Sequence, residues 1–151
     1  MNLTRAFWAA LATTAALLAP CAAADQIASQ WFGTWRVDLA KSTYPGAPPF
    51  KKMTCRIEQR GDAVRVTYDV IRPRGGITHL EWTGKFDGLD YPVQGIEDVV
   101  TNAYRRVDDR SYDVIQKVDG VISLTARMTV SPDGKRFTTV TSNSTAVFDR
   151  Q

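Results

Sequence analysis

The sequence predicts an all-β protein, in which a single antiparallel meander of eight to ten short strands closes into a small barrel. Apolar and polar residues alternate with a period of two in short segments, which is typical of half-buried strands. Turn residues separate these segments, and Asp-Gly pairs that begin at positions 87, 119 and 133 can supply the positive φ of tight hairpins. We favour a closed barrel over a two-sheet sandwich because closure leaves no exposed sheet edge.

Residues 1–24 have the pattern of an export signal. Arg5 is the only charge, and the apolar stretch 6–19 is too short to span a bilayer, which takes about 20 residues. Ala22 and Ala24 provide the small residues of a cleavage site, so we expect cleavage after Ala24 and a periplasmic or secreted protein. The alternatives are an uncleaved anchor and a lipid-modified Cys21, against which the preceding proline argues.

Residues 25–151 are expected to form one domain, since domains most often hold about 100 to 150 residues. Only Cys55 remains after cleavage, so no internal disulfide is possible, and we interpret this cysteine as a small buried apolar residue. The formal net charge of +3 is mild, and basic residues are interspersed with acidic ones. Without a basic stripe, we expect no nucleic-acid partner.

The first strand is expected within 31–39, where large apolar and polar residues alternate from Trp35 on. The segment 40–52 contains three prolines and is expected to be a loop, because proline removes backbone donors. The segment 96–103 could form a helix, but its β-branched residues favour a strand. We interpret 138–145 as part of a hydroxyl-rich edge strand and 90–95 as a connection. The remaining strands are predicted at 53–59, 63–71, 77–86, 99–107, 111–118, 121–130, 136–144 and 146–149.

The start of the first strand, Phe32-Gly33-Thr34-Trp35, resembles the Gly-x-Trp signature of lipocalins and fatty-acid-binding proteins, the calycin group of small barrels. The resemblance implies that the glycine lets the chain close the barrel beneath the large indole of Trp35. Segments 41–46 and 87–93 are also similar to those of small secreted bacterial proteins with a lipocalin-like layout. The resemblance therefore implies a ligand-binding barrel.

The chain departs from that pattern in two places. Leu89-Asp90-Tyr91 stands where lipocalins usually carry Thr-Asp-Tyr. A proline-rich loop replaces the helical lid of fatty-acid-binding proteins, and their C-terminal Arg-x-Tyr pair is missing. These departures argue against a fatty acid as the ligand.

The candidate ligand-binding residues are aromatic side chains on inward strand faces, together with two cations as anchors for an anion. Pocket walls are mostly apolar with a few placed polar groups, which is why these types are chosen. The set consists of Trp35, Tyr68, Trp82, Tyr104, Arg105 and Arg127. For each residue the alternative is an ordinary core aromatic or a surface cation.

Catalytic and metal chemistry have little support in the sequence. His79 is the only histidine, and Glu81 shares its strand face, but a metal site normally needs three or four ligands. No Gly-x-Ser-x-Gly elbow occurs. We therefore predict no metal, no cofactor and no catalytic residue.

Three functions follow from these patterns. The leading hypothesis is a non-catalytic binding protein for a small, mainly apolar molecule. The second is a barrel with a filled core that contacts another protein, as an inhibitor or envelope accessory factor. The third is an enzyme that uses His79. An interior volume of about 300 Å³ or more favours the first over the second, and the third requires His79 to line that volume.

Overall fold

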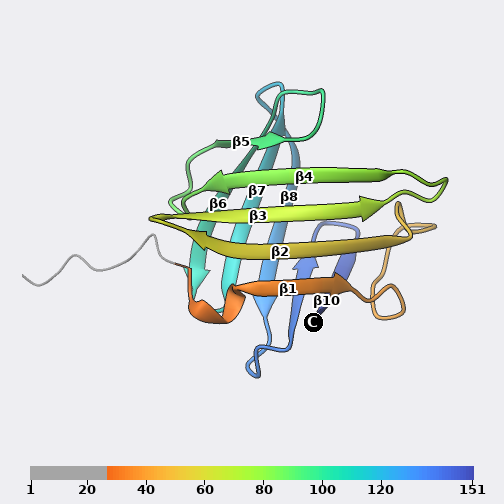
Figure 1. The fold of residues 1–151 in the computed structure, drawn as a ribbon, viewed down its shortest axis with the longest axis horizontal. Helices are drawn as coiled ribbons and strands as arrows, with labels where there is room; N and C mark the ends of the chain where they lie inside the picture. Colours follow the sequence, from red (N-terminus) through yellow and green to blue (C-terminus); the bar gives the residue numbers. More distant parts are fainter. Residues whose placement is uncertain (1–26) are drawn as a thin grey trace, which may run out of the picture.

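The computed structural model describes residues 27–151, so the predicted signal peptide lies outside the described residues. A short 3-10 helix, η1 (Ser29–Trp31), precedes ten strands (Figure 1). The strands are β1 (Gly33–Val37), β2 (Lys52–Arg60), β3 (Ala63–Ile71), β4 (Ile77–Gly84), β5 (Tyr91–Gln94), β6 (Val100–Asp108), β7 (Ser111–Val118), β8 (Val121–Val130), β9 (Arg136–Val140) and β10 (Thr145–Arg150).

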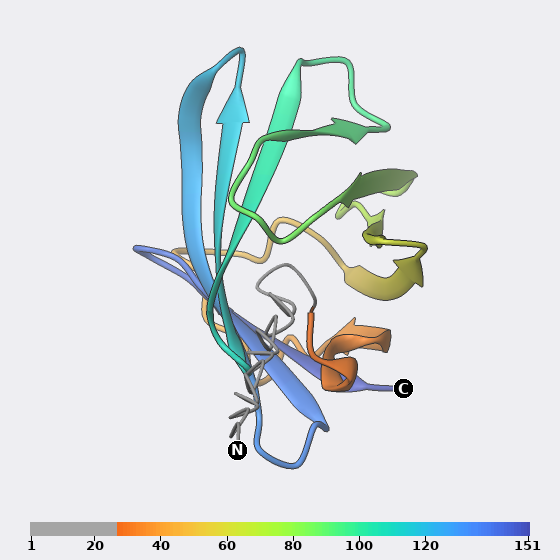
Figure 2. The same ribbon diagram turned by 90° about the vertical axis from the view of Figure 1, so that its left-hand side faces the viewer.

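The strands form one antiparallel meander that closes on itself, as the sequence predicts. Each strand pairs with the next along the chain, and β1 also pairs with β10, where Trp35 lies opposite Arg150. Figure 2 shows β2, β3 and β4 on one side of the barrel and β7 and β8 on the other. Because the order is strictly up and down, η1 lies at the end that holds the β2–β3, β6–β7 and β8–β9 turns.

Aromatic side chains fill the barrel at the end where η1 lies. The rings of Trp31 and Tyr112 meet edge to face with centroids 5.3 Å apart, and those of Trp35 and Phe137 do so at 5.0 Å. All four side chains are almost fully buried. Edge-to-face contact is a favourable geometry for aromatic rings. This aromatic cluster therefore closes the barrel at the end where η1 lies.

The N-terminal strand β1 begins at Gly33, inside the segment 31–39 that is expected to hold the first strand. Gly33 has a φ of +140°, and a Cβ atom there would lie 2.6 Å from Nη1 of Arg150. A glycine is therefore required both by the backbone and by the approach of the arginine. The close packing implied by the Gly-x-Trp resemblance is present at this end of the barrel.

Two local expectations were wrong. Residues Tyr91–Gln94 form strand β5 instead of a connection, with two register pairs to β4 and two to β6. The proline and the shortness of this strand conceal it in the sequence. The segment 138–145, expected as part of an edge strand, is not at an edge, because β9 pairs with both β8 and β10. Strand β9 ends at Val140, and the β9–β10 turn follows it.

Candidate ligand cavity

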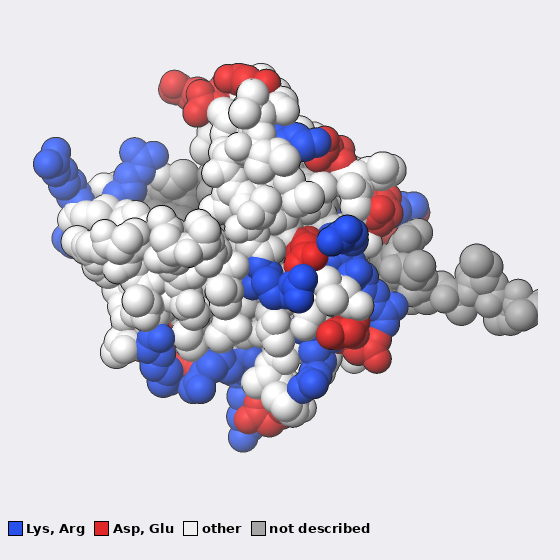
Figure 3. All heavy atoms as spheres, turned by 180° about the vertical axis from the view of Figure 1, so that it is seen from behind, with Lys and Arg blue, Asp and Glu red and all other residues white. Residues whose placement is uncertain are grey.

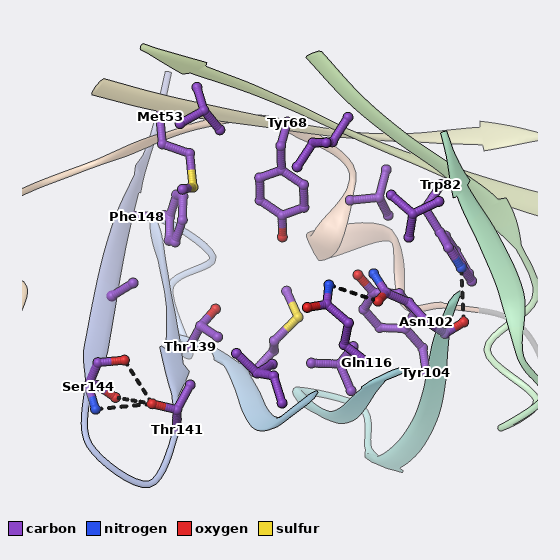
Figure 4. Close-up of a pocket in the computed structure, with 18 of the residues that line it drawn as sticks. Met53, Tyr68, Trp82, Asn102, Tyr104, Gln116, Thr139, Thr141, Ser144 and Phe148 are labelled. Carbon is purple, nitrogen blue, oxygen red and sulfur yellow. Dashed lines mark hydrogen bonds between the residues drawn. The ribbon is translucent and has the colours of Figure 1, made fainter. Parts of the chain in front are cut away.

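The barrel contains a cavity of about 290 Å³ that is partly open to solvent and whose wall is mostly apolar (Figure 4). Side chains from β2 to β10 contribute to the wall, and Tyr44 and Phe50 of the β1–β2 loop complete it. The volume lies at the lower end of the range for ligand pockets, about 300 to 1,000 Å³. The interior is therefore not filled by the protein's own side chains.

Alternation along β3 and β4 builds one side of the wall, with Glu81 as the exception on β4. Val66, Tyr68 and Val70 of β3 line the cavity, as do Leu80 and Trp82 of β4. Successive side chains of a strand point to opposite faces, so every second residue reaches the interior. Tyr68 and Trp82, which are expected on inward strand faces, are among these lining residues.

Trp82 anchors an aromatic group at the deep end of the cavity. Its ring centroid lies 4.6 Å from that of Tyr104 and 5.7 Å from that of Phe86. Its indole Nε1 donates a hydrogen bond of 3.0 Å to the carbonyl oxygen of Asn102. Since both the ring and its one donor have partners, Trp82 presents a fixed apolar surface to the cavity.

An amide pair interrupts the apolar wall. Asn102 and Gln116 lie directly opposite each other on β6 and β7, and Gln116 Nε2 donates to Asn102 Oδ1 at 3.2 Å. Figure 4 shows both side chains at the cavity, with the hydroxyl of Tyr68 pointing into the same space. Neither amide is among the predicted site residues, although Asn102 shares strand parity with Tyr104 and Gln116 with Val114. Alternation along the strands indicates an inward position for both side chains, but polar residues are usually expected to face solvent.

Hydroxyl groups line the cavity near the β9–β10 turn. The Thr141 hydroxyl lies 2.7 Å from that of Ser144 and accepts a hydrogen bond from the Ser144 backbone N–H at 3.0 Å. These bonds hold the turn between the two strands. The two hydroxyls therefore already have structural partners, unlike a group that is free to meet a ligand.

Glu81 is the one acidic residue among the described residues that line the cavity, and no basic residue does so. Burial raises the pKa of Tyr68 well above its usual value, and the neighbouring Cys55 and Tyr104 add to the shift. Burial likewise raises the pKa of Tyr104. Glu81 borders the cavity from a position between the inward Leu80 and Trp82, and its carboxylate lies 3.9 Å from the Arg65 guanidinium.

The structure places the six predicted site residues in three regions. Tyr68, Trp82 and Tyr104 line the cavity. Trp35 is fully buried in the aromatic cluster below it and is not among the lining residues. Arg105 and Arg127 lie outside the cavity.

Arg105 and Arg127 share the carboxylate of Asp113 on the outer face of the barrel. Arg105 Nη2 lies 3.0 Å from Asp113 Oδ2, and Arg127 Nε bonds to the other oxygen. Arg127 and then Arg105 hold the pKa of Asp113 below its usual value. Figure 3 shows acidic and basic side chains in contact on this face. Tyr104 and Arg105 are adjacent in a strand, so only one of them can point inward.

His79 also lies outside the cavity. Its side chain is 58% exposed, and Nδ1 is 2.7 Å from Oδ1 of Asp69 on the neighbouring strand. An enzyme built on His79 requires this histidine at the cavity, and the geometry does not provide that. Among residues 27–151 no group of three or more His, Cys, Asp or Glu side chains could hold a metal ion.

Cys55 is fully buried on β2, between Trp35 and Tyr68 in register. Burial raises the pKa of its thiol to about 12. The thiol is therefore protonated at neutral pH and packs as a small apolar side chain, as the sequence suggested.

No protein-family model matches the chain. Within the part of the chain that the structure describes, no helix is long and apolar enough to cross a membrane. The cavity is therefore identified as the candidate site from its geometry and its lining residues alone.

Proposed function

We propose that the protein is an exported, lipocalin-like binding protein that holds one small, mainly apolar molecule in its barrel without catalysing a reaction. The observation that carries the proposal is the cavity of about 290 Å³ with its apolar wall. The leader pattern of residues 1–24 and the close packing of Gly33 against Arg150 support the compartment and the family type.

The cavity also separates this proposal from a barrel that acts only through its surface. A filled core is the expectation for such a protein, since protein interiors contain few voids larger than a water molecule. Here Met53, Leu124 and Met128 face open space together with the wall of β3 and β4. Water that enters this apolar space is poorly hydrogen-bonded, so a ligand that displaces it gains the hydrophobic free energy of the wall.

Native mass spectrometry of the mature protein, purified gently from its own cell envelope, tests the proposal. We expect a small molecule that co-purifies and is lost on denaturation. A variant with a filled cavity, Ala146→Phe, should lose it, because Ala146 lines the space on β10. Val140→Phe is the matched control, since Val140 is 44% exposed on the neighbouring strand β9 and does not line the cavity.

Two results would reject the proposal. One is a bare protein mass together with no binding of a neutral apolar probe such as naphthalene. The other is a co-purifying molecule that Ala146→Phe and Val140→Phe retain equally, since it would then be bound outside the barrel.

A further inference from the structure

The amide pair of Asn102 and Gln116 places hydrogen-bonding groups on a mostly apolar stretch of the cavity wall, beside the hydroxyl of Tyr104. Asn102 is only 9% exposed, and its backbone is fixed by the indole of Trp82. The side-chain bond between the two amides uses one donor and one acceptor. An Asn side chain carries two N–H donors and a Gln side chain an acceptor oxygen, so hydrogen-bonding capacity remains on both.

A buried polar group is costly when its hydrogen-bonding capacity is unmet, about 1 to 3 kcal/mol for a neutral group. The side chain of Asn102 is also hydrogen-bonded to Tyr104, and the Ser123 hydroxyl lies 3.5 Å from Gln116 Oε1. Each amide nitrogen carries two N–H groups, so one N–H of Asn102 and one of Gln116 remain for a ligand. A neutral ligand atom that accepts a hydrogen bond at this point would pair with these N–H groups.

Charge sets the second limit on the ligand. Among the described residues that line the cavity there is no lysine, arginine or histidine, and Glu81 directs its carboxylate toward Arg65. A buried charge without a partner is strongly unfavourable. An ionised carboxylate or ammonium group is therefore disfavoured in this space, whereas a neutral polar group is not.

Volume sets the third limit. A cavity of about 150 Å³ holds benzene, so about 290 Å³ corresponds to a molecule of roughly 12 non-hydrogen atoms. The rings of Trp82, Tyr104 and Phe148 on the wall suit a flat or aromatic body.

We infer that the cavity selects an uncharged amphiphile, a compact apolar molecule with one neutral hydroxyl, carbonyl or amide group that bonds to Asn102 and Gln116. This inference rests on the proposed function and specifies the ligand class for the same cavity. It replaces the anion anchor expected from Arg105 and Arg127, which lie outside the cavity.

A matched series of probes tests the inference by isothermal titration calorimetry near neutral pH. The probes are naphthalene, 2-naphthalenemethanol, 2-naphthoate and 2-naphthylmethylammonium, which share one apolar body. We expect the alcohol to bind about two- to tenfold more tightly than naphthalene, the range for one neutral hydrogen bond. Both ions should bind at least about tenfold more weakly than the alcohol.

Variants of the amide pair connect this selectivity to the residues. The double variant Asn102→Leu/Gln116→Leu removes both amides, so neither is left unpaired, and it should bind the alcohol no better than naphthalene. Gln94→Leu is the control, because Gln94 is an exposed amide on β5 that does not line the cavity. Gln116→Lys places a cation at the wall and should strengthen 2-naphthoate binding at least about tenfold.

The outcomes separate the two proposals. If neither naphthalene nor the alcohol binds to the wild-type protein, the proposed binding function fails. If naphthalene binds but 2-naphthoate binds as tightly as the alcohol, the inference is overturned while the binding function stands. The same holds if the alcohol keeps its advantage over naphthalene in the double variant. The Gln116→Lys variant keeps the test informative if the double variant does not fold.

Discussion

The guanidinium of Arg150 lies over the indole ring of Trp35, with its central carbon 4.1 Å from the ring centroid. The same guanidinium donates to the carbonyl oxygens of Phe32 at 2.8 Å and Gly134 at 2.7 Å, and to that of Gln30. One side chain thus joins the first strand, the β8–β9 turn and the segment that contains η1. This contact closes the barrel at the end opposite the cavity's β9–β10 turn.

Replacing Arg150 is therefore expected to destabilise the whole barrel. Arg150→Met removes a partly buried cation–π contact and three charged hydrogen bonds, so we expect a loss of about 2 to 4 kcal/mol. Arg150→Lys should recover little, because an ammonium group cannot reproduce the planar fork of donors. Urea unfolding of both variants measures the effect, with Arg74→Met in the exposed β3–β4 turn as control. A loss no larger than that of the control contradicts the prediction.

The buried thiol of Cys55 should make the free energy of unfolding fall as the pH becomes alkaline. Burial raises its pKa from 9.0 to about 12 in the folded protein. Above pH 9.0 the unfolded chain releases this proton while the folded chain retains it, so its contribution to stability falls as pH rises from 9.0 toward 12. At pH 10 the loss from this group is about 1.4 kcal/mol.

Comparison with Cys55→Ala isolates that contribution from other groups that titrate in the same range. Between pH 7 and pH 10 the wild-type free energy of unfolding should fall by about 1.4 kcal/mol more than that of the variant. A thiol reagent should label the native mature chain only at the rate of unfolding. Parallel pH profiles for the two proteins, or fast labelling of the native state, are the results that oppose this view.

The fold was largely predictable because its signals are local. Strands 63–71, 111–118 and 121–130 have the bounds that the sequence analysis assigned, since turn residues such as Asp119-Gly120 interrupt a clear alternation. β5 was not predictable in the same way. Its four residues include Pro92, and it exists because β4 and β6 pair with it, which is information from outside the segment.

The candidate site was predictable only in part. Alternation places Tyr68, Trp82 and Tyr104 at the wall, but the same rule excludes Arg105, which follows Tyr104 directly. The void depends on how side chains from nine strands meet, so no single segment indicates it. The inward amides of Asn102 and Gln116 oppose the usual rule that polar residues face solvent, and such exceptions are expected at functional sites.

The outward position of Arg105 and Arg127 leads to a prediction that separates stability from binding. Arg127→Met should leave the affinity for 2-naphthalenemethanol unchanged, while lowering stability by no more than about 1 kcal/mol, as for other exposed ion pairs. The Asp113 carboxylate has a lowered pKa, so its contribution is present above pH 3.8 and is lost as pH falls through the folded-state pKa. Calorimetric titration and acid unfolding measure the two effects. A marked loss of affinity in Arg127→Met would return this arginine to the binding site.

Gly95 holds β5 close to β4 at the cavity wall. It has a φ of +95°, and a Cβ atom there would lie 1.9 Å from the carbonyl oxygen of His79. Gly75 has a similar φ of +92° with nothing within 4 Å, so the two positions carry the same backbone strain but differ in contact. Gly75→Ala should cost only the left-handed strain, about 1 to 2 kcal/mol.

Gly95→Ala must in addition push β5 away from β4, which joins it through only two register pairs, Glu81 with Gln94 and Trp82 with Val93. We therefore expect Gly95→Ala to lose at least about 2 kcal/mol more than Gly75→Ala, the size of effect seen when packed groups must shift. Because Val93 and Trp82 line the cavity, probe binding should weaken in Gly95→Ala alone. Urea unfolding and naphthalene titration of the two variants measure this, and equal losses would show that backbone strain, not the contact with β4, makes glycine necessary at position 95.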